Sequence, residues 1–151
     1  FISTAFARKS GDHAQEQAFC QRAHGLDMPL SAMSVEDLRQ LQTAGHEIGS
    51  HGVQHLSLSG LTAERARDEL VRSRETLSEW LGQAPKGFAY PYGDCHSVLG
   101  ECSNWVQQAG YEYAVTMKRG VIEAGCSVFQ LPREHAEGHW PLNDLRVFLA
   151  R

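Results

Sequence analysis

The chain has 151 residues, of which 42% are hydrophobic and 21% are charged, and its formal net charge is −4 at pH 7. This is the composition of a single globular domain with enough length for one sizeable core. The absence of any lysine and arginine cluster argues against nucleic acid or an anionic membrane surface as partner. No apolar run approaches the ~20 residues that a membrane-spanning helix needs. The four cysteines show no Cys-x-x-Cys spacing, so neither a zinc ribbon nor a redox dithiol is indicated.

The predicted elements alternate along the chain. In chain order they are the end of a strand at residues 1–6, helices at 14–24 and 34–44, a short strand that ends at His51, a helix at 62–81, a strand at 87–92, a helix at 101–109, strands at 111–116 and 127–131, and a helix at 141–150. Ser34 with Asp37 can form a capping box. Gly25 and Gly82 follow helices at the position where a left-handed residue ends them.

Two of these helices have a clear apolar face. The helix at 62–81 carries alanines and leucines on one side and arginines and glutamates on the other, and we expect the charged side to face solvent. The helix at 141–150 is expected to turn its apolar side chains toward the core; these are Leu142, Leu145, Phe148 and Leu149.

Strands that alternate with helices predict an α/β fold with parallel strands and helical crossovers. Periodicity does not separate an open doubly wound sheet from a closed barrel. In either architecture functional residues gather at the C-terminal ends of the strands. His51, Tyr92 and Arg133 each stand at or just after such an end, so we expect them to share one site.

His51 and His55 are four residues apart in a segment interrupted by Gly52. Two imidazole nitrogens at this spacing in a tight loop can bind one divalent metal. With 8 histidines in 151 residues, roughly 0.4 such pairs arise by chance, so the spacing alone is a weak signal. The alternative is a pair of solvated or loop-bracing histidines, and only the surrounding sequence can decide between the two.

That surrounding sequence resembles a known family. Residues 47–55, EIGSHGVQH, are similar to the His-Ser/Thr-x-x-His metal motif of the polysaccharide deacetylases, the NodB-homology or carbohydrate esterase family 4 group, with Gly52 where serine or threonine is commonest. Residues 88–93, FAYPYG, resemble the Pro-Tyr-Gly segment of that family's groove. Residues 131–133, LPR, resemble a late strand in one bacterial branch, and residues 1–3 resemble the end of the Ala-Thr-Phe-Phe strand. Order and approximate spacing agree over almost the whole chain.

The resemblance implies a distorted (β/α) barrel over residues 1–151 that is incomplete at its N-terminus. It also implies metal-dependent hydrolysis that removes N-acetyl groups from a carbohydrate substrate. His51 and His55 would hold the divalent metal. Zinc fits two histidines and an aspartate best, and cobalt, nickel and manganese are alternatives.

The other implied roles belong to the groove. Tyr90, Pro91 and Tyr92 would contact substrate, and the backbone N–H of Tyr92 would help to hold the oxyanion. The alternative for Tyr90 and Tyr92 is ordinary core packing. Arg133 is a candidate catalytic residue, and a structural ion pair is its alternative.

The chain departs from the family pattern at several points. Ala89 stands where many members carry an arginine that orients the catalytic aspartate. The Thr-Phe-Asp-Asp-Gly motif, which supplies the base and the third ligand, is absent, and we expect it upstream of the strand that residues 1–3 end. The alternative is a non-catalytic, carbohydrate-binding relative. No clear counterpart of the late proton-donor histidine is found, and the remaining candidates for that role are weak; they are His96, His135 and His139. The compartment and the oligomeric state stay open.

Overall fold

The computed structural model describes residues 1–27, 30–93, 99–136 and 139–149. Its elements are, in chain order, α1 (Thr4–Ala7), α2 (His13–His24), α3 (Val35–Thr43), the 3-10 turn η1 (Leu58–Gly60), α4 (Ala63–Leu81), β1 (Gly87–Ala89), the 3-10 turn η2 (Pro91–Gly93), α5 (Leu99–Gln108), β2 (Tyr113–Val115) and α6 (Leu142–Leu149). Within these described ranges no helix is both long and apolar enough to span a bilayer.

The sheet is parallel and follows the order of the chain. β1 pairs with β2, with Phe88 opposite Ala114. Single-residue parallel bridges extend the sheet on both sides; they join Ile2 to Ser50, Ser50 to Phe88, and Val115 to Leu131. A doubly wound sheet reverses its strand order at a switch point, whereas a (β/α) barrel keeps the chain order. The observed order is that of a barrel arc, which confirms the predicted incomplete α/β barrel.

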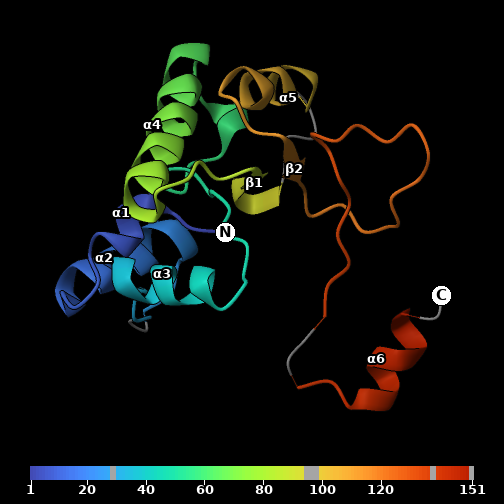
Figure 1. Cartoon of the computed structure of the whole chain (residues 1–151), viewed down its shortest axis with the longest axis horizontal. Coiled ribbons are helices and arrows are strands. Elements are labelled where there is room, and N and C mark those ends of the chain that lie inside the picture. The colour runs from blue at the N-terminus through green and yellow to red at the C-terminus, as the bar shows by residue number, and fades with distance from the viewer. Residues whose placement is uncertain (28–29, 94–98, 137–138, 150–151) are drawn as a thin grey trace.

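α4 and α5 lie beside the two strands in Figure 1 and bury the main core against them. This core contains Leu58, Ala66, Leu70, Phe88, Tyr90, Cys102, Val106, Tyr111 and Ala114. The described cysteines form no disulfide, and the thiols of Cys20 and Cys102 are buried. The charged side of α4 stays exposed, as its pattern predicts.

The helix ends follow the local signals of the sequence. Ser34 and Asp37 form the expected capping box at the start of α3. The side chain of Thr62 accepts the N–H of Arg65 at the start of α4. Gly25 and Gly82 end α2 and α4 with φ of 65° and 71°, where a side chain would be strained. The predicted boundaries of these helices are therefore confirmed to within a few residues.

Two strand predictions are wrong in extent. Only Ile2 of residues 1–6 pairs with the sheet, because the N–H groups of Thr4 and Ala5 turn to the carbonyls of Gly52 and Val53 and start α1. Only Leu131 of residues 127–131 forms a bridge, since a turn joins the carbonyl of Ser127 to the N–H of Gln130. In both places a nearby backbone acceptor or donor replaces continued strand pairing.

The inward orientation of α6 is also wrong. Of the side chains predicted to face inward, Leu142 is 61% exposed and Leu145 is only partly buried. Figure 1 shows α6 apart from the other helices, at the far end of the extended segment that follows β2. An amphipathic pattern predicts a helix with an apolar face, but it does not predict that another element covers that face. The side chains of Phe148 and Leu149 lie outside the described part of the structure.

The packing of α4 on β1 gives a stability prediction. Leu70→Ala is expected to lower the free energy of unfolding by about 2–5 kcal/mol, because its side chain is 0% exposed and leaves a cavity. Val121→Ala, at a position 70% exposed, should change it by less than about 0.5 kcal/mol. Urea denaturation of both variants measures the difference, and equal midpoints would contradict this account of the core.

Candidate active site

The site begins where Ser50 is held between two neighbouring segments. The N–H of Ser50 donates to the carbonyl of Gly87 at 2.9 Å, and its carbonyl accepts the N–H of Ala89 at 2.9 Å. On the other side the N–H of His51 donates to the carbonyl of Ile2 at 2.9 Å. His51 therefore stands at the C-terminal end of the sheet, where α/β proteins place functional side chains.

His51 presents one free ring nitrogen. Its Nδ1 lies 2.7 Å from the carbonyl oxygen of Ala89. Because a carbonyl can only accept, Nδ1 carries the proton and Nε2 keeps its lone pair. Burial lowers the pKa of His51 to about 4, and the positive charge of Arg133, like that of His55 when it is protonated, acts in the same direction. A neutral imidazole with a fixed tautomer is the form that binds a metal.

His55 completes the pair that the sequence predicts. The ring centroids of His51 and His55 are 4.7 Å apart. His55 is 6% exposed, and its Nδ1 is buried without a hydrogen-bond partner. Burial, followed by the positive charge of His24, lowers its pKa. A buried ring nitrogen of this kind fits a ligand atom, so both histidines suit a divalent cation. Metal binding itself stays a prediction.

His24 is a third imidazole at this site, and the sequence reasoning did not find it. It ends α2, and its ring centroid lies 4.5 Å from that of His55. The three histidines line one cavity of about 250 Å³. Among the described residues no group of three His, Cys, Asp or Glu is arranged to hold a metal, so His24 borders the pair rather than joining it. No spacing in the sequence signals it, because only tertiary packing brings α2 to the loop.

Tyr92 lies against the same histidines. Its φ is 59°, in the left-handed region that non-glycine residues rarely adopt. Its ring centroid is 4.7 Å from that of His55, and its hydroxyl donates to the carbonyl of Ala23 at 2.8 Å. Strained backbone of this kind is common at functional sites. The structure thus brings Tyr92 to the histidine pair, with its side chain 49% exposed.

The expected contacts of Tyr90 and Pro91 with substrate are corrected. Tyr90 is 1% exposed, packs edge to face on Phe88, and donates its hydroxyl to the carbonyl of Phe129 at 2.9 Å. Pro91 is equally buried. Both side chains pack in the core, because the turn that exposes Tyr92 directs the two preceding residues inward.

Arg133 lies near the histidine pair on a separate segment. Its Nε donates to the carbonyl of Thr116 at 2.7 Å, and its N–H donates to the carbonyl of Lys118 at 2.9 Å. Burial lowers the pKa of its guanidinium group, which still keeps its charge. It lines a second cavity together with the exposed His135. His139 is exposed, and His96 lies outside the described residues.

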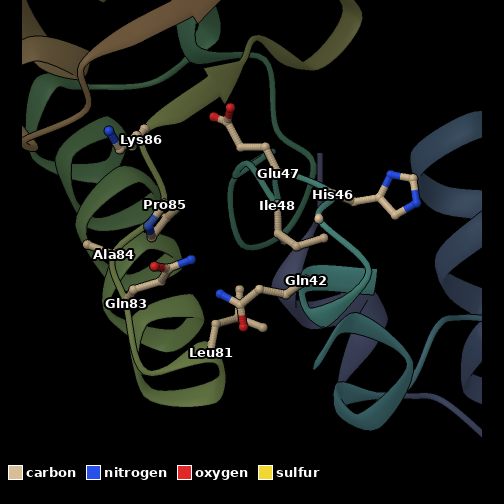
Figure 2. A pocket seen from close by; sticks show the side chains of 10 residues that line it. Gln42, His46, Glu47, Ile48, Leu81, Gln83, Ala84, Pro85 and Lys86 are labelled. Carbon is tan, nitrogen blue, oxygen red and sulfur yellow. The ribbon is translucent and has the colours of Figure 1, made fainter. Parts of the chain in front are cut away.

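A further cavity of about 400 Å³ lies at the opposite end of the sheet. Figure 2 shows its lining from α3, the segment before His51, and the link from α4 to β1, with His46 directed away from Pro85. This cavity borders the N-terminal ends of the strands, the side of such a fold that contributes to stability and not to chemistry. His46 therefore lies in the same segment as His51 but outside its site.

These features define a class: a parallel barrel arc with a neutral histidine pair at the C-terminal ends of its strands. The family model of the polysaccharide deacetylases matches residues 6–114. The match covers more than half of the chain, so the protein belongs to the polysaccharide deacetylase family, as its motifs predict.

Individual relatives agree with this assignment. The chain is 32% identical over 66 residues to a peptidoglycan deacetylase of Helicobacter pylori, covering 44% of this chain and 22% of that protein. It shares its fold with the deacetylase PplD of Streptococcus pyogenes in complex with acetate, with a TM-score of 0.76 and 16% identity over 97% of this chain and 55% of that one. A polysaccharide deacetylase from Bacillus cereus gives a TM-score of 0.60 and 23% identity over 68% and 32% of the two chains. The matches thus span about half or less of each relative's length.

The buried neutral His51 predicts a pH dependence of stability. The unfolded chain takes up a proton near pH 6.5, whereas folded His51 does so only near pH 4. The unfolded state therefore binds more protons between these values, and the free energy of unfolding falls as the pH is lowered. His51 should contribute a loss of about 2 kcal/mol between pH 7 and pH 5 in metal-free protein.

His51→Gln is expected to reduce this slope, because glutamine does not titrate. Urea denaturation of the two proteins at both pH values, in the presence of a chelator, measures the difference. The remaining slope of the variant includes the contributions of His55 and of the N-terminal amine of Phe1, whose pKa values are lowered as well. Identical slopes for the two proteins would show that folded His51 is not held neutral.

Proposed function

We propose that the protein removes N-acetyl groups from a carbohydrate by metal-dependent hydrolysis of the amide bond. The observation that carries this proposal is the pair His51 and His55 at the C-terminal end of the sheet. Burial favours the neutral form of both rings. Nε2 of His51 keeps its lone pair, and Nδ1 of His55 is buried without a hydrogen-bond partner. Membership of the polysaccharide deacetylase family, whose metal motif residues 51–55 resemble, supports this proposal.

His51 and His55 would hold the divalent cation, with zinc the best fit to imidazole ligands and cobalt, nickel or manganese as alternatives. When bound, such a cation supplies Lewis-acid activation for attack of water on an amide carbonyl. The hydrogen bond from His51 Nδ1 to the Ala89 carbonyl orients the ring, which is the usual support for a metal-binding histidine.

Two further residues have proposed roles in the reaction. The left-handed turn at Tyr92 would direct its backbone N–H toward the negative oxygen that develops on the substrate carbonyl. The half-exposed Tyr92 ring would form a wall of the groove, on which a sugar ring can pack. The Arg133 guanidinium, fixed through Thr116, would stabilise negative charge near the histidines.

The family and the named relative support a choice of substrate class. The Helicobacter pylori protein is a peptidoglycan deacetylase, so N-acetylated glycan strands of this type are the first candidate substrate. The chain spans only part of the length of its relatives. The activity is therefore measured on the product of the complete reading frame as well as on the 151-residue chain.

The activity test is acetate release from N-acetylglucosamine oligomers with added Zn²⁺ or Co²⁺. We expect release by the wild-type protein and a loss of at least 100-fold in His51→Ala, as an order of magnitude for removal of a group that holds a catalytic metal. His46→Ala is the matched control, because it also removes a histidine side chain from this segment. His46 borders the cavity of Figure 2 and not the site of His51. The activity of this variant should stay within about twofold of wild type.

Two outcomes would overturn the proposal. If His51→Ala released acetate as fast as His46→Ala, the histidine pair would have no role in the reaction. If the wild-type protein of the complete reading frame bound N-acetylglucosamine oligomers without releasing acetate with any of the four metals, the protein would be a non-catalytic carbohydrate-binding relative.

A further inference from the structure

The loop that carries both histidines is held from two sides. On one side α1 binds its carbonyl groups: the N–H of Thr4 donates to Gly52 at 3.1 Å, and the N–H of Ala5 donates to Val53 at 3.0 Å. Hydrogen bonds from the first N–H groups of a helix are common, because these groups have no partner inside the helix. The carbonyl groups of the loop are thereby fixed, and its N–H groups need acceptors elsewhere.

Those acceptors come from one buried carboxylate on α4. Glu69 is 9% exposed, and its Oε2 accepts the N–H of Val53 at 2.9 Å and the N–H of Gln54 at 2.9 Å. Hydrogen bonds to an ionised acceptor are about twice as strong as neutral ones. Because one oxygen binds two consecutive N–H groups, it fixes the orientation of the two peptide planes that carry the N–H groups of Val53 and Gln54, which lie between the two histidines.

The loop is shaped to admit this carboxylate. Gly52 has a φ of +82°, and a Cβ atom built on it would lie 3.2 Å from Oε2 of Glu69. His55, at the other end, has a φ of 59°. The backbone between the histidines is thus bent at both ends, and a bend of this kind persists only where surrounding contacts hold it.

We propose that Glu69 is a positioning residue that sets the distance and orientation of His51 and His55 for a shared metal ion. Its carboxylate acts through the backbone N–H groups of Val53 and Gln54. This inference rests on the proposed function, since it assigns Glu69 to the metal site of that function. Removal of Glu69 leaves His51 and His55 in the sequence but releases the backbone that brings their rings together.

The test is Co²⁺ binding to the metal-free chain, followed by visible absorption, for wild type, Glu69→Ala, Glu69→Gln and Glu75→Ala. We expect Glu69→Ala to bind Co²⁺ ~10- to 100-fold more weakly, the range for supporting residues of metal sites. Glu69→Gln keeps one acceptor oxygen and should recover part of the affinity. Glu75→Ala, on the exposed side of the same helix, should bind as wild type does.

Amide hydrogen exchange in the metal-free proteins provides the second readout. Exchange of the Val53 and Gln54 N–H groups should accelerate in Glu69→Ala and stay slow in Glu75→Ala. Urea denaturation establishes that each variant is folded at the temperature of the titration, and Glu69→Gln keeps the side-chain volume if Glu69→Ala fails to fold.

The outcomes separate this inference from the proposed function. Wild-type Co²⁺ affinity in folded Glu69→Ala or Glu69→Gln, or unchanged exchange at both N–H groups, would overturn the positioning role and leave the metal site intact. Absence of Co²⁺ binding by the wild-type protein would overturn the metal site itself, and the positioning role with it. Weaker binding together with faster exchange supports the proposal.

Discussion

The parallel pairing of Ser50 is the interaction on which the site depends. Its backbone hydrogen-bonds to β1, while the next residue, His51, hydrogen-bonds to Ile2. When a residue pairs with neighbouring segments of a sheet, the side chain of the next residue, at the end of the strand, points in a fixed direction. The Ser50 side chain is tied as well, since its hydroxyl lies 2.8 Å from that of Ser73 on α4. His51, the first of the two proposed metal ligands, thus directly follows a residue that is hydrogen-bonded through both its backbone and its side chain.

The polar groups beneath the histidine loop form one connected network in the core. The hydroxyl of Ser50 accepts the N–H of Gly52, the hydroxyl of Ser73 lies 3.0 Å from that of Tyr111, and Tyr111 donates to the carbonyl of Leu70. Buried polar groups need such partners, because each unpaired group costs about 1–3 kcal/mol. α4 thereby serves the fold with its apolar face and the site with Ser73 and Glu69. One helix thus contributes both to the core and to the hydrogen bonds beneath the histidine loop.

Electrostatics favour the neutral form of the histidine pair. Burial lowers the pKa of both His51 and His55, and each ring also lies near positive charge from Arg133 or His24. A protonated imidazole cannot bind a cation, so the burial that disfavours the charged rings leaves them in the form that the proposed metal site requires. Tyr92 then covers His55 from the groove side with its ring. The arrangement agrees with membership of the polysaccharide deacetylase family and with the proposed hydrolysis.

The sequence by itself determined the helices apart from α1, the parallel α/β class, the family and the pairing of His51 with His55, because caps, periodicity and short motifs are local signals. Only the tertiary structure decided between an open sheet and a barrel arc, since strand order is a property of long-range pairing. It also decided that Tyr90 is core and that His24 and Glu69 reach the histidine loop. The apolar face of α6 was evident in the sequence. Whether another element covers that face depends on tertiary contacts, and Leu142 is in fact exposed.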